Sequence, residues 1–238
     1  MKNIILPFLL LSIPVLLSAQ GSSKTFRWGI TFNPNLSHQF IVNDGTGTPE
    51  FEELLNEIEV FRFGYAVQSY VEWNLDESFA LQLGLGYKRN GSATKRSELL
   101  FPDLINPNPS PNPVSGQETR TVFTRNNVEI PLNLVFRPWK RVMVSVGTSG
   151  LIVLSGGQEL LIYDSDGNVS STDISAGNPE LNSFDVTLNF GIGATVFSIN
   201  QKEVFVQPLF QLGLFNVYEP VPLNRKNYNI GLTVGLRI

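Results

Sequence analysis

The stretch that decides the fold is Tyr228–Ile238, with the sequence YNIGLTVGLRI. Every second residue of this stretch is apolar, and the residues between them are small or polar. Because successive side chains of a β-strand point to opposite faces, the pattern predicts a strand with one apolar face and one small, polar face. A soluble sheet rarely ends on an unprotected apolar strand, since a free edge pairs with other chains. A closed barrel in a membrane has no free edge, because its last strand pairs with its first.

Seven further stretches of the sequence alternate in the same way. Most of them span at least nine residues, which is the length that a tilted membrane strand needs. The predicted strands are Phe26–Asn33, Phe61–Trp73, Phe79–Tyr87, Val128–Phe136, Val142–Gly150, Phe184–Val196 and Val204–Leu214. Short turns near Asn74, Pro138 and Gln201 alternate with longer connections. Eight strands joined in this way are typical of an outer-membrane barrel.

Two proline positions lead to local expectations. Pro34, followed by Asn35, is expected to end the first strand. Pro131 lies inside the fourth strand, where its missing N–H group predicts a β-bulge. That strand should also begin before Val128, near Val122.

The segment Gln158–Ile174 has the pattern of a β-hairpin that extends beyond the membrane. Its centre, Asp164–Asn168, contains an Asp-Gly pair, which is a strong signal for a hairpin turn. Asp164, Asp166 and Asn168 also have the spacing of the first three ligands of a calcium-binding loop. However, Val169 and Ser175 occupy the places where such a loop requires Gly and Glu, so we favour the turn and expect no metal site.

The N-terminal residues 1–19 have the features of a secretory signal peptide. Lys2 supplies a positive charge, an apolar run from Ile4 to Leu17 follows, and Ser18-Ala19-Gln20 offers a small-residue cleavage site. The apolar run is shorter than the roughly 20 residues that a membrane-spanning helix needs. We therefore expect residues 1–19 to be removed on export and residues 20–238 to form one outer-membrane β-barrel domain.

The composition excludes several classes of protein. Charged residues make up 16% of the 238 residues and the net charge is −4, so we expect no nucleic-acid partner, which would require a basic surface. The chain contains no cysteine, which excludes disulfides, thiolate metal sites and a lipid-modified N-terminal cysteine.

These observations predict an all-β fold. We expect an eight-stranded antiparallel up-and-down transmembrane β-barrel, located in the cell outer membrane and surrounded by outer-membrane lipid. It should have short periplasmic turns and long extracellular loops, which are residues 36–60, 90–120 and 154–183. Aromatic residues gather near both ends of the predicted strands, as expected for the two interfaces of a bilayer.

A soluble, secreted, lipocalin-like carrier of an apolar ligand is the alternative. It also has eight alternating strands, and alternation alone does not say which face is inside. The polar face of these strands consists mainly of Gly, Ser, Thr, Asn and Gln. A water-facing exterior would be rich in charge, whereas a narrow lumen requires small polar groups, so the residues favour the membrane barrel.

Three segments carry a resemblance to a known family. The leader ending in Ser18-Ala19-Gln20, the strand Val128–Leu134 and the Gly-containing strand Val142–Gly150 resemble the PorT-like outer-membrane β-barrel proteins of Bacteroidota. The resemblance covers nearly the whole mature chain and implies an outer-membrane location and an eight-stranded fold. PorT itself is associated with type IX secretion, so a type IX secretion accessory barrel is a further alternative.

The same alternation places charged residues on the inward face of the barrel. This lumen charge cluster consists of Arg27, Arg62, Glu72, Glu129, Asp185 and Arg237. Because buried charges must pair or neutralise, we expect an ion-paired plug that stiffens the barrel, with a gated ion path as the alternative.

Nothing in the sequence points to catalysis. The one histidine, His38, lies beside Ser37, and adjacent residues of an extended chain point apart, so they make a poor catalytic dyad. We therefore predict a non-enzymatic barrel without a cofactor. Its loops 36–60, 90–120 and 154–183 would bind an envelope or extracellular protein partner.

Overall fold

The computed structural model describes residues 26–42, 53, 56–98, 118–164, 166–175, 180–200, 202–219 and 224–238. The predicted signal peptide and its cleavage site lie outside these ranges. Within them, no helix combines the length and the hydropathy needed to cross a membrane.

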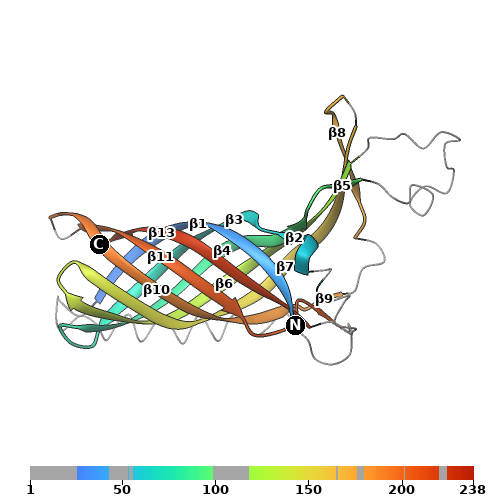
Figure 1. Ribbon diagram of the computed structural model, residues 1–238. Helices are drawn as coiled ribbons and strands as arrows, with labels where there is room; N and C mark the ends of the chain where they lie inside the picture. Colours follow the sequence, from blue (N-terminus) through green and yellow to red (C-terminus); the bar gives the residue numbers. More distant parts are fainter. Residues whose placement is uncertain are drawn as a thin grey trace, which may run out of the picture.

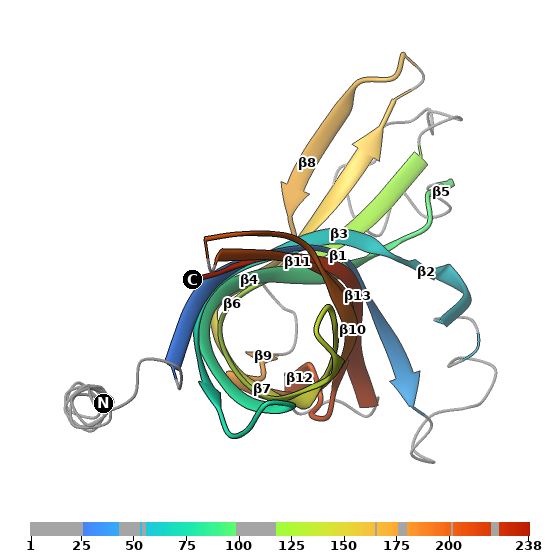
Figure 2. The same ribbon diagram turned by 90° about the vertical axis from the view of Figure 1, so that its left-hand side faces the viewer.

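Eight long antiparallel strands form a closed barrel (Figures 1 and 2). They are β1 (Phe26–Val42), β3 (Arg62–Asn74), β4 (Phe79–Thr94), β6 (Glu118–Trp139), β7 (Val142–Tyr163), β10 (Phe184–Ile199), β11 (Lys202–Gly213) and β13 (Asn224–Arg237). Each pairs with its neighbours in chain order, and β13 pairs with β1 from Gly29 opposite Arg237 to Val42 opposite Asn224. This last pairing closes the ring and confirms the predicted up-and-down barrel.

The two ends of the barrel differ. Short turns between Asn74 and Phe79, Trp139 and Val142, and Ile199 and Lys202 lie at one end, which we call the short-turn end. The opposite end, which we call the long-loop end, carries the short strands (Figure 1). These strands are β2 (Glu59–Val60), β5 (Ser97–Glu98), β8 (Val169–Asp173), β9 (Glu180–Leu181) and β12 (Tyr218–Glu219).

At the long-loop end, the barrel strands continue into segments that were predicted as loops. β1 runs through Pro34 to Val42, β4 runs to Thr94, and β7 runs to Tyr163, so the expected loop boundaries at residues 36, 90 and 154 were wrong. Pro34 interrupts the β1–β13 ladder only between Phe32 and Asn35, and the register is the same on both sides. One missing N–H group is tolerated because the rest of the ladder is intact.

The bulge predicted at Pro131 was also wrong. The register of β6 with β4 and with β7 is unchanged across Pro131. The register of β6 with β7 shifts instead between Asn126 and Asn127 and between Phe136 and Trp139.

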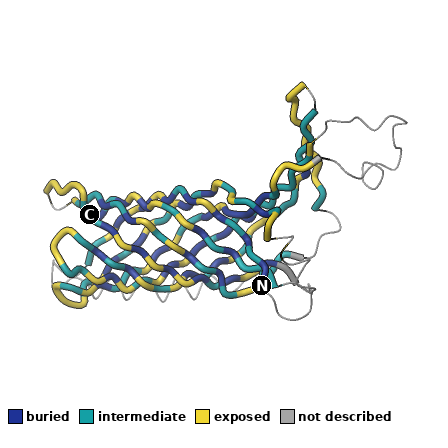
Figure 3. The backbone as a smooth tube through the Cα atoms, viewed as in Figure 1, coloured by how far each residue is buried: buried dark blue, intermediate teal, exposed yellow. Residues whose placement is uncertain are grey.

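The apolar face of the barrel strands points outward. Trp28, Phe63 and Leu85 are each at least half exposed, whereas Ser37 and Asn127 are completely buried in the lumen. Buried and exposed residues alternate along the strands (Figure 3). A polar lumen inside an apolar exterior contradicts the lipocalin-like alternative, which requires the opposite arrangement.

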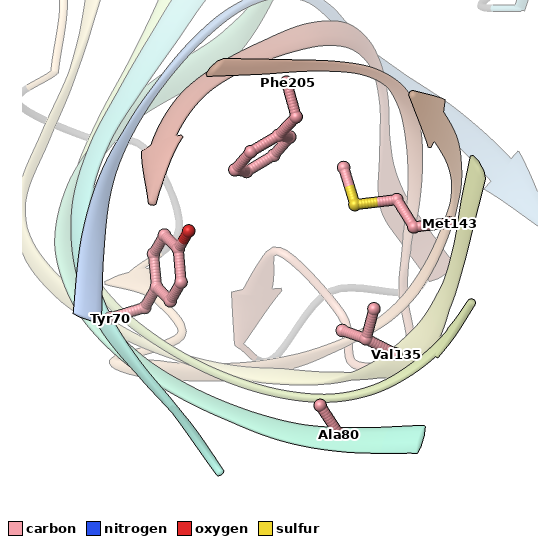
Figure 4. Packing of buried hydrophobic residues seen from close by; sticks show 5 residues of the cluster. All are labelled: Tyr70, Ala80, Val135, Met143 and Phe205. Carbon is pink, nitrogen blue, oxygen red and sulfur yellow. The ribbon is translucent and has the colours of Figure 1, made fainter. Parts of the chain in front are cut away.

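One apolar cluster lies inside the barrel near the short-turn end (Figure 4). It consists of Tyr70, Ala80, Val135, Met143 and Phe205. Glycines at the paired positions of the adjacent strands, Gly29 opposite Tyr70 and Gly235 opposite Phe205, leave room for the two rings of the cluster. A Cβ atom on Gly29 would lie 2.5 Å from the Tyr70 ring, and one on Gly235 would overlap the Phe205 ring. The cluster therefore fills the lumen where the neighbouring strands carry no side chain.

Candidate functional site

A network of ion pairs crosses the lumen beside the apolar cluster. Arg237 of β13 is at its centre, with Nη2 at 3.3 Å from Glu72 Oε2 and Nη1 at 2.7 Å from Glu203 Oε2. Arg137 Nη2 lies 2.6 Å from Glu72 Oε2, and Arg27 Nη1 lies 3.3 Å from Glu203 Oε1. The five residues come from β1, β3, β6, β11 and β13, so this short-turn network links strands on different sides of the ring.

The centre of the short-turn network is protected from water, whereas the Arg27 and Glu203 side chains at its edge are 39% and 23% exposed. Glu72 is completely buried and Arg237 almost so. The Arg237 guanidinium also lies over the Phe205 ring, 5.2 Å from its centroid. Charge-assisted hydrogen bonds in a low-dielectric interior are strong when every partner is present. The short-turn network and the apolar cluster together obstruct the lumen at the short-turn end.

A second group of polar side chains occupies the middle of the lumen. Lys88 Nζ donates a hydrogen bond to Gln211 Oε1 at 2.5 Å and lies 3.8 Å from Glu129 Oε1. Gln68 and Gln211 donate to the two oxygens of Glu129 at 2.6 and 2.8 Å. Lys88 and Glu129 are both fully buried. The Glu129 carboxylate therefore has three polar partners, which offset the cost of its burial.

Further pairs lie toward the long-loop end. Arg125 Nη1 is 3.9 Å from Asp185 Oδ2, and Asp185 Oδ1 accepts a hydrogen bond from the Phe215 amide at 3.2 Å. Arg225 Nη1 is 2.6 Å from Glu59 Oε1. Arg62 donates to the Phe123 carbonyl oxygen and to Thr124 Oγ1. Charge pairs thus occur along the length of the lumen.

The structure does not gather the predicted lumen charges into one cluster. Arg27, Glu72 and Arg237 belong to the short-turn network, while Glu129 lies in the middle of the lumen. Asp185 pairs with Arg125, and Arg62 bonds near the long-loop end.

Sequence reasoning missed four partners of these charges, which are Lys88, Arg125, Arg137 and Glu203. Lys88, Arg137 and Glu203 lie one residue outside the predicted strand bounds, and Arg125 lies in the predicted extension of the fourth strand toward Val122. Continuing the alternation of Gln82, Gly84 and Gly86 by one step would have placed Lys88 inside.

Beyond the barrel, β6 and β7 continue as a twisted ribbon. β5 pairs with β6 and β8 pairs with β7, so that a small sheet projects away from the barrel (Figure 1). We call it the protruding sheet; it comprises β5, β8, residues 118–122 of β6 and residues 159–163 of β7. Arg96 adds a contact within it, 3.8 Å above the centroid of the Tyr163 ring.

The β7–β8 hairpin confirms the turn predicted at Asp164–Asn168. Asp164 Oδ1 accepts hydrogen bonds from the amides of Asp166 at 3.0 Å and Asn168 at 2.7 Å, and Gly167 has a φ of 83°. The Asn168 side-chain amide donates to Asp164 Oδ2 at 2.9 Å. These hydrogen bonds lower the pKa of Asp164, and the hydrogen bond from the Asn168 side chain has the largest effect. Its carboxylate thus holds the turn together.

The single histidine and its neighbouring serine face opposite sides of the barrel wall. Ser37 Oγ donates to the Gly91 carbonyl in the lumen at 2.6 Å. The His38 ring packs between Phe61 and Tyr228, with centroids 5.1 and 5.2 Å away. In the described part of the chain, no group of three or more His, Cys, Asp or Glu residues could hold a metal ion.

A family model described as outer membrane protein beta-barrel domain matches residues 18–219. The chain belongs to this family. It is therefore an integral outer-membrane β-barrel, and lipid surrounds the apolar exterior described above. Among curated proteins, no sequence matches that of this barrel.

Several solved structures are similar to this outer-membrane barrel. Neisserial surface protein A is 9% identical, with a TM-score of 0.42, and the alignment covers 87% of this chain and 95% of that one. Ail of Yersinia pestis, solved in complex with the heparin analogue sucrose octasulfate, is 10% identical, with a TM-score of 0.35 and coverages of 89% and 99%. The outer membrane protease OmpT of Escherichia coli is 9% identical, with a TM-score of 0.42 and coverages of 91% and 97%.

Proposed function

We propose that this barrel is a non-conducting, non-enzymatic anchor that displays the protruding sheet outside the cell, where the sheet binds an envelope or extracellular protein. One observation carries the proposal. Ion pairs and apolar side chains fill the lumen, while β6 and β7 continue beyond the barrel as a paired ribbon.

The filled lumen argues against transport of ions. A path through it would have to separate Arg237 from Glu72 and Glu203, and also Lys88 from Glu129. Removing one partner from a buried pair costs about 3–5 kcal/mol, because the other charge is left without compensation. An eight-stranded barrel is also just wide enough for side chains to fill its interior. The barrel therefore serves as a rigid support.

The sidedness follows from the connections. In bacterial outer-membrane barrels, short turns face the periplasm and long loops face outside. The short-turn end of this barrel would face the periplasm, and the protruding sheet would face the medium. The predicted removal of residues 1–19 on export agrees with this placement.

The absence of cysteine makes the sidedness easy to test. We expect Thr172→Cys, in β8, to react with a membrane-impermeant maleimide on intact cells. Lys140→Cys, in a short turn, should react only after the outer membrane is permeabilised. The reverse labelling pattern would refute the display of the sheet. A steady conductance of the purified barrel in planar bilayers would refute the filled lumen.

Binding by the sheet is tested with a photo-crosslinking amino acid in living cells. Placed at Ser171, it should give one discrete protein adduct. Placed at Lys140, it serves as the matched control for nonspecific contact. The absence of any adduct specific to position 171 would count against the binding role.

We further propose that the chain is one of the PorT-like barrels of Bacteroidota, as the resemblance of Val128–Leu134 and Val142–Gly150 suggests. Whether it assists type IX secretion is tested by deleting its gene and measuring export of that system's cargo.

A further inference from the structure

The protruding sheet has a free edge. β8 pairs with β7 from Glu159 opposite Asp173 to Tyr163 opposite Val169, and with no other strand among the described residues. All five β8 residues are exposed. Natural sheets blunt such edges with Lys, Pro or a bulge, because unpaired N–H and C=O groups invite another strand. β8 is five residues long and contains neither Lys nor Pro, its register with β7 is unbroken, and its one charged residue is Asp173.

Hydrogen bonds on either side of β8 identify the groups that face outward. The Ile174 amide donates to the Gln158 carbonyl at 2.9 Å, and the Asp164 amide donates to the Asn168 carbonyl at 3.1 Å. Hydrogen-bonded and non-hydrogen-bonded pairs alternate along an antiparallel ladder, so the even-numbered residues of β8 bond to β7. Three residues therefore direct their N–H and C=O groups away from the sheet: Val169, Ser171 and Asp173.

The hairpin that carries this edge is acidic. Between Arg141 and Lys202 the sequence contains no Lys or Arg. The acidic residues of the hairpin are Glu159, Asp164, Asp166 and Asp173. Glu159 and Asp173 lie directly opposite each other, and like charges in such a pair are destabilising. A cation on an adjacent strand would offset this repulsion.

We propose that β8 binds an extended, basic segment of a partner protein as an additional antiparallel strand. This inference rests on the proposed display of the protruding sheet. Backbone hydrogen bonds to the outward-facing groups would supply affinity, and the side chains beside them would supply specificity.

The register of the added strand follows from β8. A basic residue would lie opposite Asp173, a small residue opposite Ser171, and an apolar residue opposite Val169. Tyr163 is the β7 partner of Val169, and the Arg96 guanidinium lies over one face of its ring. Because the strands are antiparallel, the partner sequence reads basic-x-small-x-apolar from its N-terminus.

A second copy of this chain fits the edge less well. Two β8 edges would bring two acidic hairpins together, and their charges would repel each other. The opposite edge of the sheet, near Lys95 and Arg96, is more basic, so pairing of β5 with β8 of another copy is an outcome to be tested.

The test uses the whole barrel in nanodiscs and fluorescent nonapeptides built on the basic-x-small-x-apolar pattern. The panel varies Lys or Arg, Ser or Thr, and Val, Ile or Tyr at the three positions. We expect Ser171→Pro to weaken binding at least about tenfold relative to Ser171→Ala, because proline removes an outward N–H and is tolerated on an edge. Asp173→Lys should reverse the preference, so that peptides with Glu in place of the basic residue bind better.

Three outcomes would overturn the proposal. The first is that no peptide of the panel binds. The second is binding that Ser171→Pro and backbone N-methylation of the peptide leave unchanged, which would indicate simple charge attraction. The third is self-association without peptide that Ser171→Pro abolishes, which would assign the edge to a second copy. The labelling of Thr172→Cys on cells is independent of peptide binding, so failure of this inference is distinguishable from failure of the anchor.

Discussion

Replacing Glu72 by Gln should destabilise the barrel strongly while leaving its shape unchanged. The Glu72 carboxylate is completely buried and lies 2.6 Å from Arg137 and 3.3 Å from Arg237. Gln keeps the size of the side chain but removes the carboxylate that pairs with Arg137 and one of the two that pair with Arg237. Loss of one partner from a buried ion pair costs about 3–5 kcal/mol, which is on the order of a hundredfold or more in the folding constant.

Glu118 provides a matched control. It forms the same type of pair with Arg96 at 3.8 Å, but its side chain is 50% exposed and lies in the protruding sheet. An exposed pair contributes about 0–1 kcal/mol, so Glu118→Gln should have little effect.

Both variants are measured by reversible urea unfolding in lipid vesicles, followed by the fluorescence of the three tryptophans. Equal free energies of unfolding for the two variants would refute the view that the short-turn network holds the lumen together. A Glu72→Gln barrel that unfolds like the wild type would refute it as well.

Other substitutions test the packing, the exterior and the hairpin turn. Gly235→Ala should lower the free energy of unfolding by about 1–3 kcal/mol in the same assay, because the added Cβ atom would overlap the Phe205 ring. Gly150→Ala should be nearly neutral, because the added Cβ atom would have no neighbour closer than 3.6 Å. Ile192→Arg should lower the free energy of unfolding in vesicles by about 2–4 kcal/mol, because this side chain is 52% exposed and faces lipid. Val169→Arg, at a similarly exposed position (54%) beyond the barrel, should change it by less than about 0.5 kcal/mol. Asn168→Ala should raise the pKa of Asp164 toward its ordinary value, as measured by NMR titration of the carboxyl carbon, because it removes the main cause of the lowered pKa. The hydrogen bonds that lower this pKa stabilise the turn only while Asp164 is ionised, so the turn should loosen as the pH falls through the pKa of the folded state. A turn that is insensitive to acid would contradict this assignment.

The alternation of apolar and polar residues predicted the eight barrel strands and which face of each points outward, because the lipid requires apolar side chains on the outer face. Outside the membrane the constraint disappears, although the backbone ladder continues. β7 shows this clearly, since the pattern fades after Gly150 while its pairing with β6 extends to Tyr163. The ends of the strands on the long-loop side were missed for this reason, whereas Lys88 was missed because the predicted strand was ended one residue too early.

The partners of the lumen charges could not be read from the sequence either. Arg27 and Glu203 are separated by 176 positions along the chain, and they meet because the closed ring brings β1 and β11 to the two sides of β13. The position of a charged residue in the alternating pattern predicts that its side chain points inward. The number of strands, their tilt and their stagger decide which charges face each other.

The closure of the ring also constrains how the protein is made. β1 forms one ladder with the neighbouring β3, but its other ladder requires β13, which is synthesised after all the other strands. Until then both edges of the growing sheet are open and its apolar face is uncovered, a state that is prone to aggregation. We therefore expect the chain to reach the membrane before β1 and β13 have paired. Assembly is the slow and vulnerable stage in the life of this molecule, because contacts between distant segments form slowly.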